Sequence, residues 1–446
     1  MKATLEADLR PVETSPLTNE ELRQLMRERS PGEIVMLAER VKHTGGCEHP
    51  IRLRATGLGS PSVGEPDGVL LIACKSRRET RCEPCAATYR ADARQIVRAG
   101  LEGGKGMPLT VASHPAVFVT VTAPSFGPVH RAGGAPCHAR GPGRCSHGRP
   151  KSCLSRHTES DELVGAPLCA QCYDYLGAVL FNATAGELWR RVTIYARRHL
   201  AYLLKRPERE LKDEVRLSYL KVAELQRRGV VHLHGIVRAD AARDEVLPPP
   251  AEITTLLLSR AILRAVAAVY KEVEIEGVTR RLVFGEQVRV DPLSAGEARG
   301  VASYLAKYLT KEASGTGALD HRLREGELEY LELPEHLRRV VETAWSLGEE
   351  RGQDRLRRFA HALGYTGHVM TKSRRYSTTF RQLRLARLAW RLAATDEPSI
   401  GRELQWSYVG SGFSRPIDAI LASTVAEDRR RARGERWASL REEKAA

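Results

Sequence analysis

Residues 230–237, with the sequence VVHLHGIV, constrain the fold of this chain most. Branched apolar residues favour a buried strand, and two histidines interrupt this run. Because strand side chains alternate between the two faces, His232 and His234 must point the same way. Two imidazoles on one face suit a single metal ion. With 14 histidines in 446 residues, however, a lone His-x-His pair is a weak signal.

A second segment, residues 302–311 with the sequence ASYLAKYLTK, has the spacing of a helix. It places four side chains at positions i, i+3, i+4 and i+7, on a single face: Tyr304, Lys307, Tyr308 and Lys311. Tyrosines at this spacing usually pack in a core or an interface. Beside lysines and a two-histidine metal site, a pair of phenols also suits attack on a DNA phosphate.

A third segment, residues 117–124 with the sequence VFVTVTAP, predicts a strand that ends in Thr-x-Thr just before a turn. In this order the three segments resemble the motifs of the HUH endonucleases, and the paired tyrosines resemble the two-tyrosine rolling-circle initiators. Longer stretches, among them CEPCAATYRADARQIVRAGLEGGKG, CYDYLGAVLFNATAGELWRR and TKSRRYSTT, look like the RepSA-type initiators of actinobacterial plasmids and integrative elements. The resemblance runs from about residue 46 to about residue 412.

The resemblance implies that the chain nicks and rejoins one DNA strand through a 5′-phosphotyrosine. Motif alignment assigns the first attack to Tyr304 and the second, circle-closing reaction to Tyr308. Lys307 would neutralise a phosphate or help to deprotonate the phenol. Two alternatives stay open: a two-tyrosine HUH transposase, and a non-catalytic zinc-stabilised DNA-binding regulator, which would leave the clustered His, Glu and Tyr residues unexplained.

The catalytic metal site is predicted from a hairpin. Residues 217–225 read as a strand, and residues 226–229 as the turn into the His-x-His strand. Glu224 would then lie across the hairpin from the histidines, unless it is simply a solvated strand residue. One carboxylate and two imidazoles suit Mg²⁺ or Mn²⁺. Glu286, in the sequence FGEQV, is an alternative ligand or base.

The charge balance predicts a polyanionic partner. The chain has 70 Lys and Arg against 55 Asp and Glu, a net charge of +15, and nucleic acid is the commonest partner of such proteins. An anionic membrane surface is the alternative, but no basic amphipathic helix with an aromatic anchor stands out. No run of about 18 apolar residues and no signal-peptide pattern occurs. We therefore expect a cytoplasmic protein that binds origin DNA, single-stranded or as a hairpin, and no membrane.

The chain has no Gly-x-x-x-x-Gly-Lys-Ser/Thr loop for ATP, so unwinding and synthesis would need a host helicase and polymerase. Basic residues near the predicted tyrosine helix and in the C-terminal region are expected to contact DNA phosphates: Lys311, Lys372, Arg374, Arg375 and Arg384. The alternative is that they form a merely solvated basic face.

Nine cysteines fall into two groups on either side of the strand at 117–124, and each group contains a Cys-x-x-Cys pair. In a reducing compartment such groups are typical of structural zinc. We expect about two Zn²⁺ ions, one held by Cys47, Cys74, Cys82 and Cys85, the other by Cys145, Cys153, Cys169 and Cys172. In the second set His138, His147 and His157 compete with the cysteines. A redox Cys-x-x-Cys would instead need a βαβ setting and no companion cysteines.

The order of predicted elements favours an α+β fold, an HUH-type antiparallel sheet covered by helices. Three regions are expected: residues 1–108 with a zinc-ribbon-like site of four cysteines, 109–315 as the nicking domain with a zinc-binding insertion at about 127–172, and 316–446 as a mostly helical basic region. Helices are predicted at about 85–99, 173–204, 251–272 and 297–311, a further strand at 280–290, and a helix capped by Thr18 or Asn19.

Overall fold

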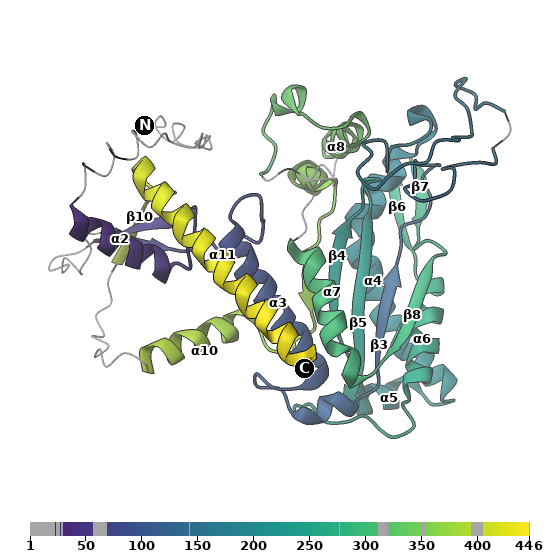
Figure 1. Ribbon diagram of the computed structural model, residues 1–446. Coiled ribbons are helices and arrows are strands. Elements are labelled where there is room, and N and C mark those ends of the chain that lie inside the picture. The colour runs from purple at the N-terminus through teal and green to yellow at the C-terminus, as the bar shows by residue number, and fades with distance from the viewer. Residues whose placement is uncertain are drawn as a thin grey trace. The chain divides into compact units, whose positions relative to one another are not determined.

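The computed structural model divides the chain into two compact units, Met1–Thr88 with Pro398–Ala446, and Tyr89–Glu397. We treat each unit separately (Figure 1). The structure describes residues 23, 27, 30–56, 69–141, 143–275, 277–310, 319, 321–349, 354–393 and 405–445. The helix predicted near Thr18 lies outside the described residues. Within them, no helix is both long and apolar enough to cross a membrane.

The first unit contains a three-stranded antiparallel sheet in the order β10-β1-β2, formed by β1 (Ile51–Thr56), β2 (Val69–Ile72) and β10 (Gln405–Ser411). Helices α2 (Pro31–His43) and α11 (Pro416–Ala445) share a small apolar cluster: Leu37, Val41, Ala422 and Val425. A capping box starts α2, because Ser30 Oγ accepts from the Glu33 amide and the Glu33 carboxylate accepts from the Ser30 amide.

The second unit is built on a five-stranded antiparallel sheet in the order β8-β3-β5-β4-β9, with β5 in the middle. Its strands are β3 (Ala116–Val121), β4 (Val215–Leu225), β5 (Val231–Ala241), β8 (Val288–Leu293) and β9 (Met370–Lys372). A separate pair, β6 (Lys271–Ile275) and β7 (Val278–Leu282), forms a hairpin. The predicted strand at 280–290 is therefore wrong as one element, since β7 and β8 share that range. The expected mixture of helices with antiparallel sheets is confirmed.

The helices of this unit are α3 (Glu83–Glu102, which starts in the first unit), α4 (Tyr175–Leu203), α5 (Glu208–Glu214), α6 (Thr255–Ala268), α7 (Ala298–Thr310), α8 (Glu335–Leu347), α9 (Asp354–Phe359) and α10 (Phe380–Ala393). On one face of the sheet, α4 and α6 pack over the odd-numbered side chains of β5. Gly235 permits a close approach there, because a Cβ would lie 2.2 Å from Cη2 of Trp189.

The opposite face of the sheet carries α7, α10 and the second half of α3. Leu305 and Leu309 of α7 join Ile96 of α3 and Ile236 of β5 in one buried cluster. His232 and His234 have the same strand parity as Ile236, so they lie on the α7 face. The fold thus brings the His-x-His strand and the tyrosine helix to one side of the sheet.

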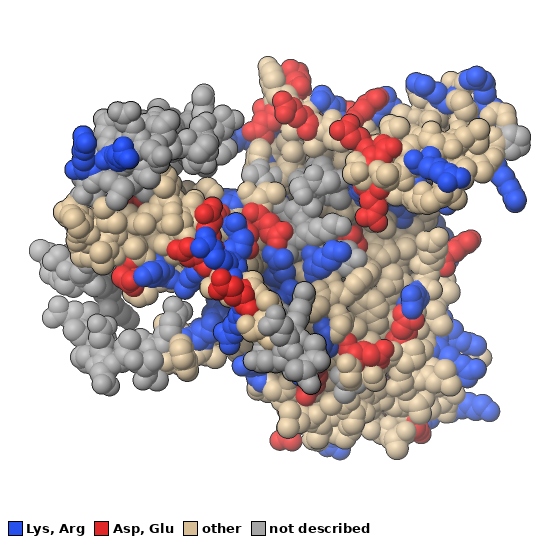
Figure 2. Space-filling model, viewed as in Figure 1, with Lys and Arg blue, Asp and Glu red and all other residues tan. Residues whose placement is uncertain are grey.

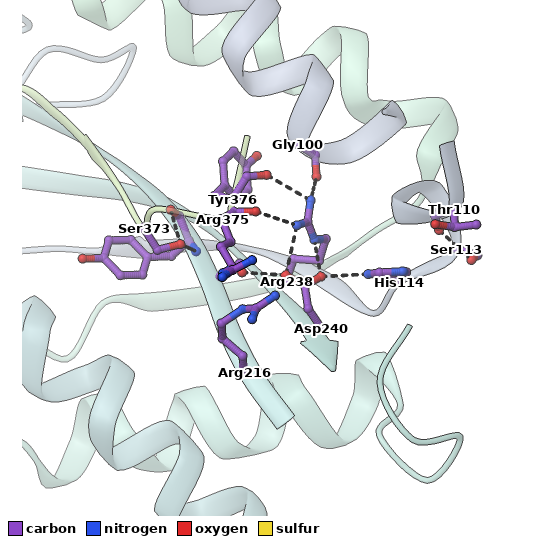
Figure 3. Close-up of polar contacts among 12 residues, drawn as sticks. Gly100, Thr110, Ser113, His114, Arg216, Arg238, Asp240, Ser373, Arg375 and Tyr376 are labelled. Atoms are coloured by element: carbon purple, nitrogen blue, oxygen red, sulfur yellow. Dashed lines mark hydrogen bonds and ion pairs between the residues drawn. The ribbon is translucent and has the colours of Figure 1, made fainter. Parts of the chain in front are cut away.

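A buried ionic network joins β5 to its neighbours on this face (Figure 3). Arg238 and Asp240 are fully buried and form a two-bond pair, with Nε–Oδ1 at 2.7 Å and Nη2–Oδ2 at 3.0 Å. His114 Nδ1 lies 2.7 Å from Asp240 Oδ1. Arg238 also donates to the carbonyl oxygens of Gly100 and Tyr376. The pair therefore anchors the C-terminal end of α3 and the segment before α10 to the central strand.

We expect Asp240→Asn to lower the free energy of unfolding by about 3–5 kcal/mol, because it leaves the Arg238 charge buried without its counterion. Burial raises the pKa of Asp240, but hydrogen bonds from His114 and Arg238 outweigh it and the net pKa is lowered. The stabilisation is therefore present above the unfolded pKa of about 3.9 and lost as pH falls through the native value. Urea unfolding followed by tryptophan fluorescence measures this difference.

The control for this prediction is Asp244→Asn, which removes a fully exposed carboxylate paired with Arg375. This variant should unfold close to the wild-type midpoint, because exposed ion pairs contribute little. Equal midpoints for the two variants would show that the buried charge pair does not stabilise the fold.

Candidate functional site

Three predicted metal ligands lie together on the α7 face of the sheet. The ring centroids of His232 and His234 are 4.5 Å apart. Both residues are buried, with 9% of the surface of His232 and 2% of that of His234 exposed. Glu224 of β4 stands directly opposite His232 in the strand register. Its Oε2 atom is 3.5 Å from Nε2 of His234. The hairpin thus gathers two imidazoles and one carboxylate at its turn end.

The chemistry of this donor set fits a divalent cation. Burial, together with the neighbouring His234 and Arg228, lowers the pKa of His232 to about 4. The imidazole is therefore neutral at physiological pH, the form that binds metals. Its Nδ1 atom is buried with no hydrogen-bond partner in the described part of the chain. Two imidazoles and one carboxylate suit Mn²⁺ or Mg²⁺, although these donors do not all lie within 4.8 Å of one another.

Tyr304 of α7 lies beside this histidine pair. Its ring meets the His234 ring edge-on, with centroids 5.3 Å apart and an interplanar angle of 85°. Tyr304 is 42% exposed. The opposite side of α7 is buried and carries Ala302, Leu305, Ala306 and Leu309. The phenol is therefore held near the histidines by a packed helix and remains open to solvent.

Two residues of β3 complete the surroundings of His234. Phe118 stacks on the His234 ring at 5.8 Å and meets Tyr304 edge-on at 5.9 Å. Thr120 Oγ1 lies 3.3 Å from Nδ1 of His234. The sequence interpretation gave these residues no role. In residues 117–121 three valines alternate with Phe118 and Thr120. This alternation was the signal that could have placed Phe118 and Thr120 on one face of the sheet.

The other predicted catalytic residues are less completely described. Lys307 is exposed on α7. Tyr308 lies one turn beyond Tyr304 in the backbone of α7, but its side chain, like the whole of Lys311, lies outside the described residues. Glu286 is exposed in the loop before β8, and among the described contacts none joins it to the histidines.

The predicted DNA-binding residues differ in their exposure to solvent and in their hydrogen-bond and ion-pair partners. Arg374 and Arg384 are exposed, and Arg384 donates through Nε to the Phe380 carbonyl at 3.2 Å. Arg375 pairs with the exposed Asp244. The Lys372 ammonium is half-buried and donates to the Ser377 carbonyl at 2.8 Å, and burial lowers its pKa. Lys372 therefore stabilises its own loop, a role that the sequence did not indicate.

Arg374 and Arg375 also line an open pocket. Basic and hydroxyl side chains form part of its lining, beside the apolar Met107 and Val246; they are Lys105, Arg374, Arg375, Ser377, Thr378 and Thr379. Such a lining suits phosphate oxygens.

In the first unit, the four predicted cysteines Cys47, Cys74, Cys82 and Cys85 converge, with their sulfur atoms within 4.8 Å of one another. The sulfur atoms of Cys47 and Cys82 are 3.9 Å apart. The Cys74 amide donates to the Cys47 sulfur at 3.2 Å, a contact that favours a thiolate. Four thiolates at this separation could hold a closed structural Zn²⁺ site.

The structure brings together three cysteines of the second predicted set but not the fourth. Cys145, Cys169 and Cys172 do converge, but their fourth partner is His147 and not Cys153. Cys153 lies instead with Cys137, because the two amide–carbonyl contacts between His138 and Cys153 (2.8 and 3.0 Å) fold the chain back there. The loop between them carries Cys145 and His147 to the Cys-x-x-Cys pair. Linear spacing does not reveal this fold-back.

Comparison with known proteins gives the class of this chain. A curated protein of Streptomyces ambofaciens, named "Replication initiator protein", is 39% identical over 440 residues, which cover 91% of this chain and 93% of that protein. The family model RepSA, described as "Replication initiator protein, pSAM2", matches residues 33–427. The chain belongs to the RepSA family of replication initiators, and the family expected from its motifs is confirmed. No solved structure matches it.

Proposed function

We propose that this replication initiator is an HUH-type endonuclease that nicks one strand at its origin and rejoins it through a phosphotyrosine intermediate. The observation that carries the proposal is the position of Tyr304, whose ring is 5.3 Å from that of His234, on the sheet face that also carries His232 and Glu224. A nucleophile beside a cation-binding donor set is the arrangement that phosphoryl transfer requires.

In the first step, the Tyr304 hydroxyl attacks the scissile phosphorus. A bond forms between the tyrosine oxygen and phosphorus, and the bond from phosphorus to the 3′ oxygen breaks. The phenol proton leaves, and the 3′ oxygen gains a proton to become the 3′-OH that primes synthesis. The product is a 5′-phosphotyrosine ester, so the energy of the phosphodiester is kept and rejoining needs no ATP.

The side chains around Tyr304 would assist this attack in different ways. Phenols are mostly protonated at neutral pH, and the exposed Lys307 ammonium, one helical turn away, would favour the phenolate or neutralise a phosphate. Thr120 and Phe118 fix the orientation of His234. His232, His234 and Glu224 would hold Mg²⁺ or Mn²⁺. When bound, such an ion polarises the scissile phosphate and offsets the negative charge on its oxygens.

Tyr308 would serve the second transesterification. It follows Tyr304 by four residues in α7, so the two backbone positions are about one turn apart. While Tyr304 carries the 5′ end of the displaced strand, termination needs another hydroxyl group. A second tyrosine one turn along the same helix satisfies this requirement.

DNA would bind over a basic surface that includes Arg374, Arg375 and Arg384, with Lys311 beyond the described residues. The zinc-binding insertion offers a further basic surface, because residues 128–158 contain six Lys and Arg and no Asp or Glu. Figure 2 shows several of these basic side chains over the insertion, at the upper right. Contacts of this kind position the phosphate backbone without reading its sequence. Strand separation and synthesis would fall to a host helicase and polymerase.

The proposal predicts that purified protein with Mg²⁺ or Mn²⁺ cleaves single-stranded DNA from its own origin and stays attached to the 5′ end of the downstream fragment. An oligonucleotide labelled at its 3′ end should shift to the mass of the protein on a denaturing gel. A scrambled oligonucleotide and a chelator are the controls, and both should abolish the shift. Cleavage that leaves a free 5′ phosphate would rule out a tyrosine nucleophile.

A further inference from the structure

We infer that residues 127–172 bind two zinc ions, and that the additional ion is held by His130, Cys137, Cys153 and His157. The ligand atoms of these four residues all lie within 4.8 Å of one another. The inference does not depend on the nicking chemistry, and its readout is metal content.

Three separations between these ligand atoms come close to the edge lengths of a tetrahedral zinc site. Zn²⁺ binds sulfur at about 2.3 Å and imidazole nitrogen at about 2.0–2.1 Å, so the edges of a regular tetrahedron are about 3.3–3.8 Å. Nδ1 of His130 is 3.1 Å from Nε2 of His157, which is 3.4 Å from the Cys153 sulfur. The Cys137 sulfur is 3.9 Å from Nδ1 of His130. Two sulfurs and two nitrogens in this geometry suit Zn²⁺.

Groups behind the ligands hold them in a metal-binding form. Nδ1 of His157 lies 2.6 Å from the carboxylate of Asp161, so the opposite ring nitrogen, Nε2, is the one that faces the cluster. A carboxylate behind a ligating imidazole is the common support of zinc-bound histidines. The Arg131 amide donates to the Cys137 sulfur at 3.1 Å, which stabilises a thiolate. Cys137 and His157 are both buried.

Backbone contacts explain why ligands so far apart in sequence meet. The His138–Cys153 bridge brings Cys137 and Cys153 onto neighbouring segments, and the amide of Cys137 donates to the Ser155 carbonyl at 2.9 Å. The amide of Gly133 donates to the His157 carbonyl at 3.1 Å, which draws His157 toward His130. The additional site therefore closes the base of the loop whose tip supplies Cys145 and His147 to the neighbouring site.

The assignment accounts for the cysteines of the chain. All nine are free thiols in the structure, and all nine fall within the three metal-binding groups. Cys137, which the sequence interpretation left without a partner, becomes a ligand. The described residues from 127 to 168 form isolated bridges and turns but no helix or strand, so bound metal would supply the free energy that orders them.

Native mass spectrometry of the full chain tests the inference. Wild-type protein should carry three zinc ions, and Cys137→Ser should carry two. His321→Ala, which changes an exposed imidazole paired with Glu327 outside the three metal-binding groups, should keep all three. Two ions in wild-type protein, or an unchanged count in Cys137→Ser, would overturn the additional site.

A second measurement needs no variant, and so cannot be confused by misfolding. Cadmium-113 substituted for zinc in the wild-type chain should give three separate NMR resonances, because ligand sets of four, three and two sulfurs shield the nucleus differently. Two resonances, with none in the range of a two-sulfur, two-nitrogen site, would contradict the inference.

Discussion

Tyr304→Phe is expected to reduce the initial nicking of origin DNA by about 1,000-fold or more. Phenylalanine keeps the ring that packs against His234 and Phe118 but removes the oxygen that would attack phosphorus. DNA binding and thermal stability should therefore stay close to wild type. Single-turnover cleavage of a labelled oligonucleotide, with binding measured in parallel by fluorescence anisotropy, separates the two effects.

Two other tyrosines provide the comparison. Tyr330→Phe alters a tyrosine that is 82% exposed and among the described contacts has none with the histidines, so it should nick like wild type. Tyr308→Phe should still nick but accumulate covalent intermediates or long concatemers, since the second hydroxyl is missing. If Tyr308→Phe fails to nick while Tyr304→Phe nicks normally, the roles of the two tyrosines are reversed.

His232→Ala is expected to lower cleavage by about 100-fold or more, because it removes a ligand of the cation that offsets charge on the phosphate. DNA binding should survive, since the basic surface is unchanged. The measurement is the cleavage rate at increasing Mn²⁺ concentration, in which this variant should stay slow throughout. His321→Ala, which changes an exposed imidazole paired with Glu327, is the control and should cleave normally. Normal cleavage by His232→Ala at low Mn²⁺ would contradict the assignment of His232 as a metal ligand.

Local periodicity in the sequence predicted part of the candidate site. Strand alternation placed His232 and His234 on one face of a strand, and helical spacing placed Tyr304 and Lys307 on one face of a helix. Neither pattern predicts that the strand face and the helix face meet. In the structure their meeting depends on Leu305 and Leu309 of α7, which pack in the cluster that contains Ile236. Long-range packing of this kind is not visible in sequence periodicity, and only the order of the family motifs indicated it.

Other features depend on contacts between residues far apart in the sequence. Strand β10 pairs with β1, about 350 residues earlier, although the sequence placed these segments in separate regions. Arginine is a residue type that usually lies at the surface, yet Arg238 is fully buried beside Asp240. Cys153 follows Cys145 at the same spacing at which Cys82 follows Cys74. Backbone contacts with His138 nevertheless place Cys153 in a different group of candidate ligands. In each case tertiary pairing outweighs the local pattern.

The most direct test of the nicking proposal is the identity of the residue that carries the DNA. Wild-type protein should be reacted with an origin oligonucleotide in Mn²⁺, digested with a protease and a nuclease, and mapped by mass spectrometry. The account predicts a nucleotide 5′-phosphate on the peptide that contains Tyr304, joined through the phenolic oxygen. An adduct found solely on Tyr308 would exchange the two roles. The absence of an adduct from both tyrosines, in protein that still cleaves its origin, would contradict the account.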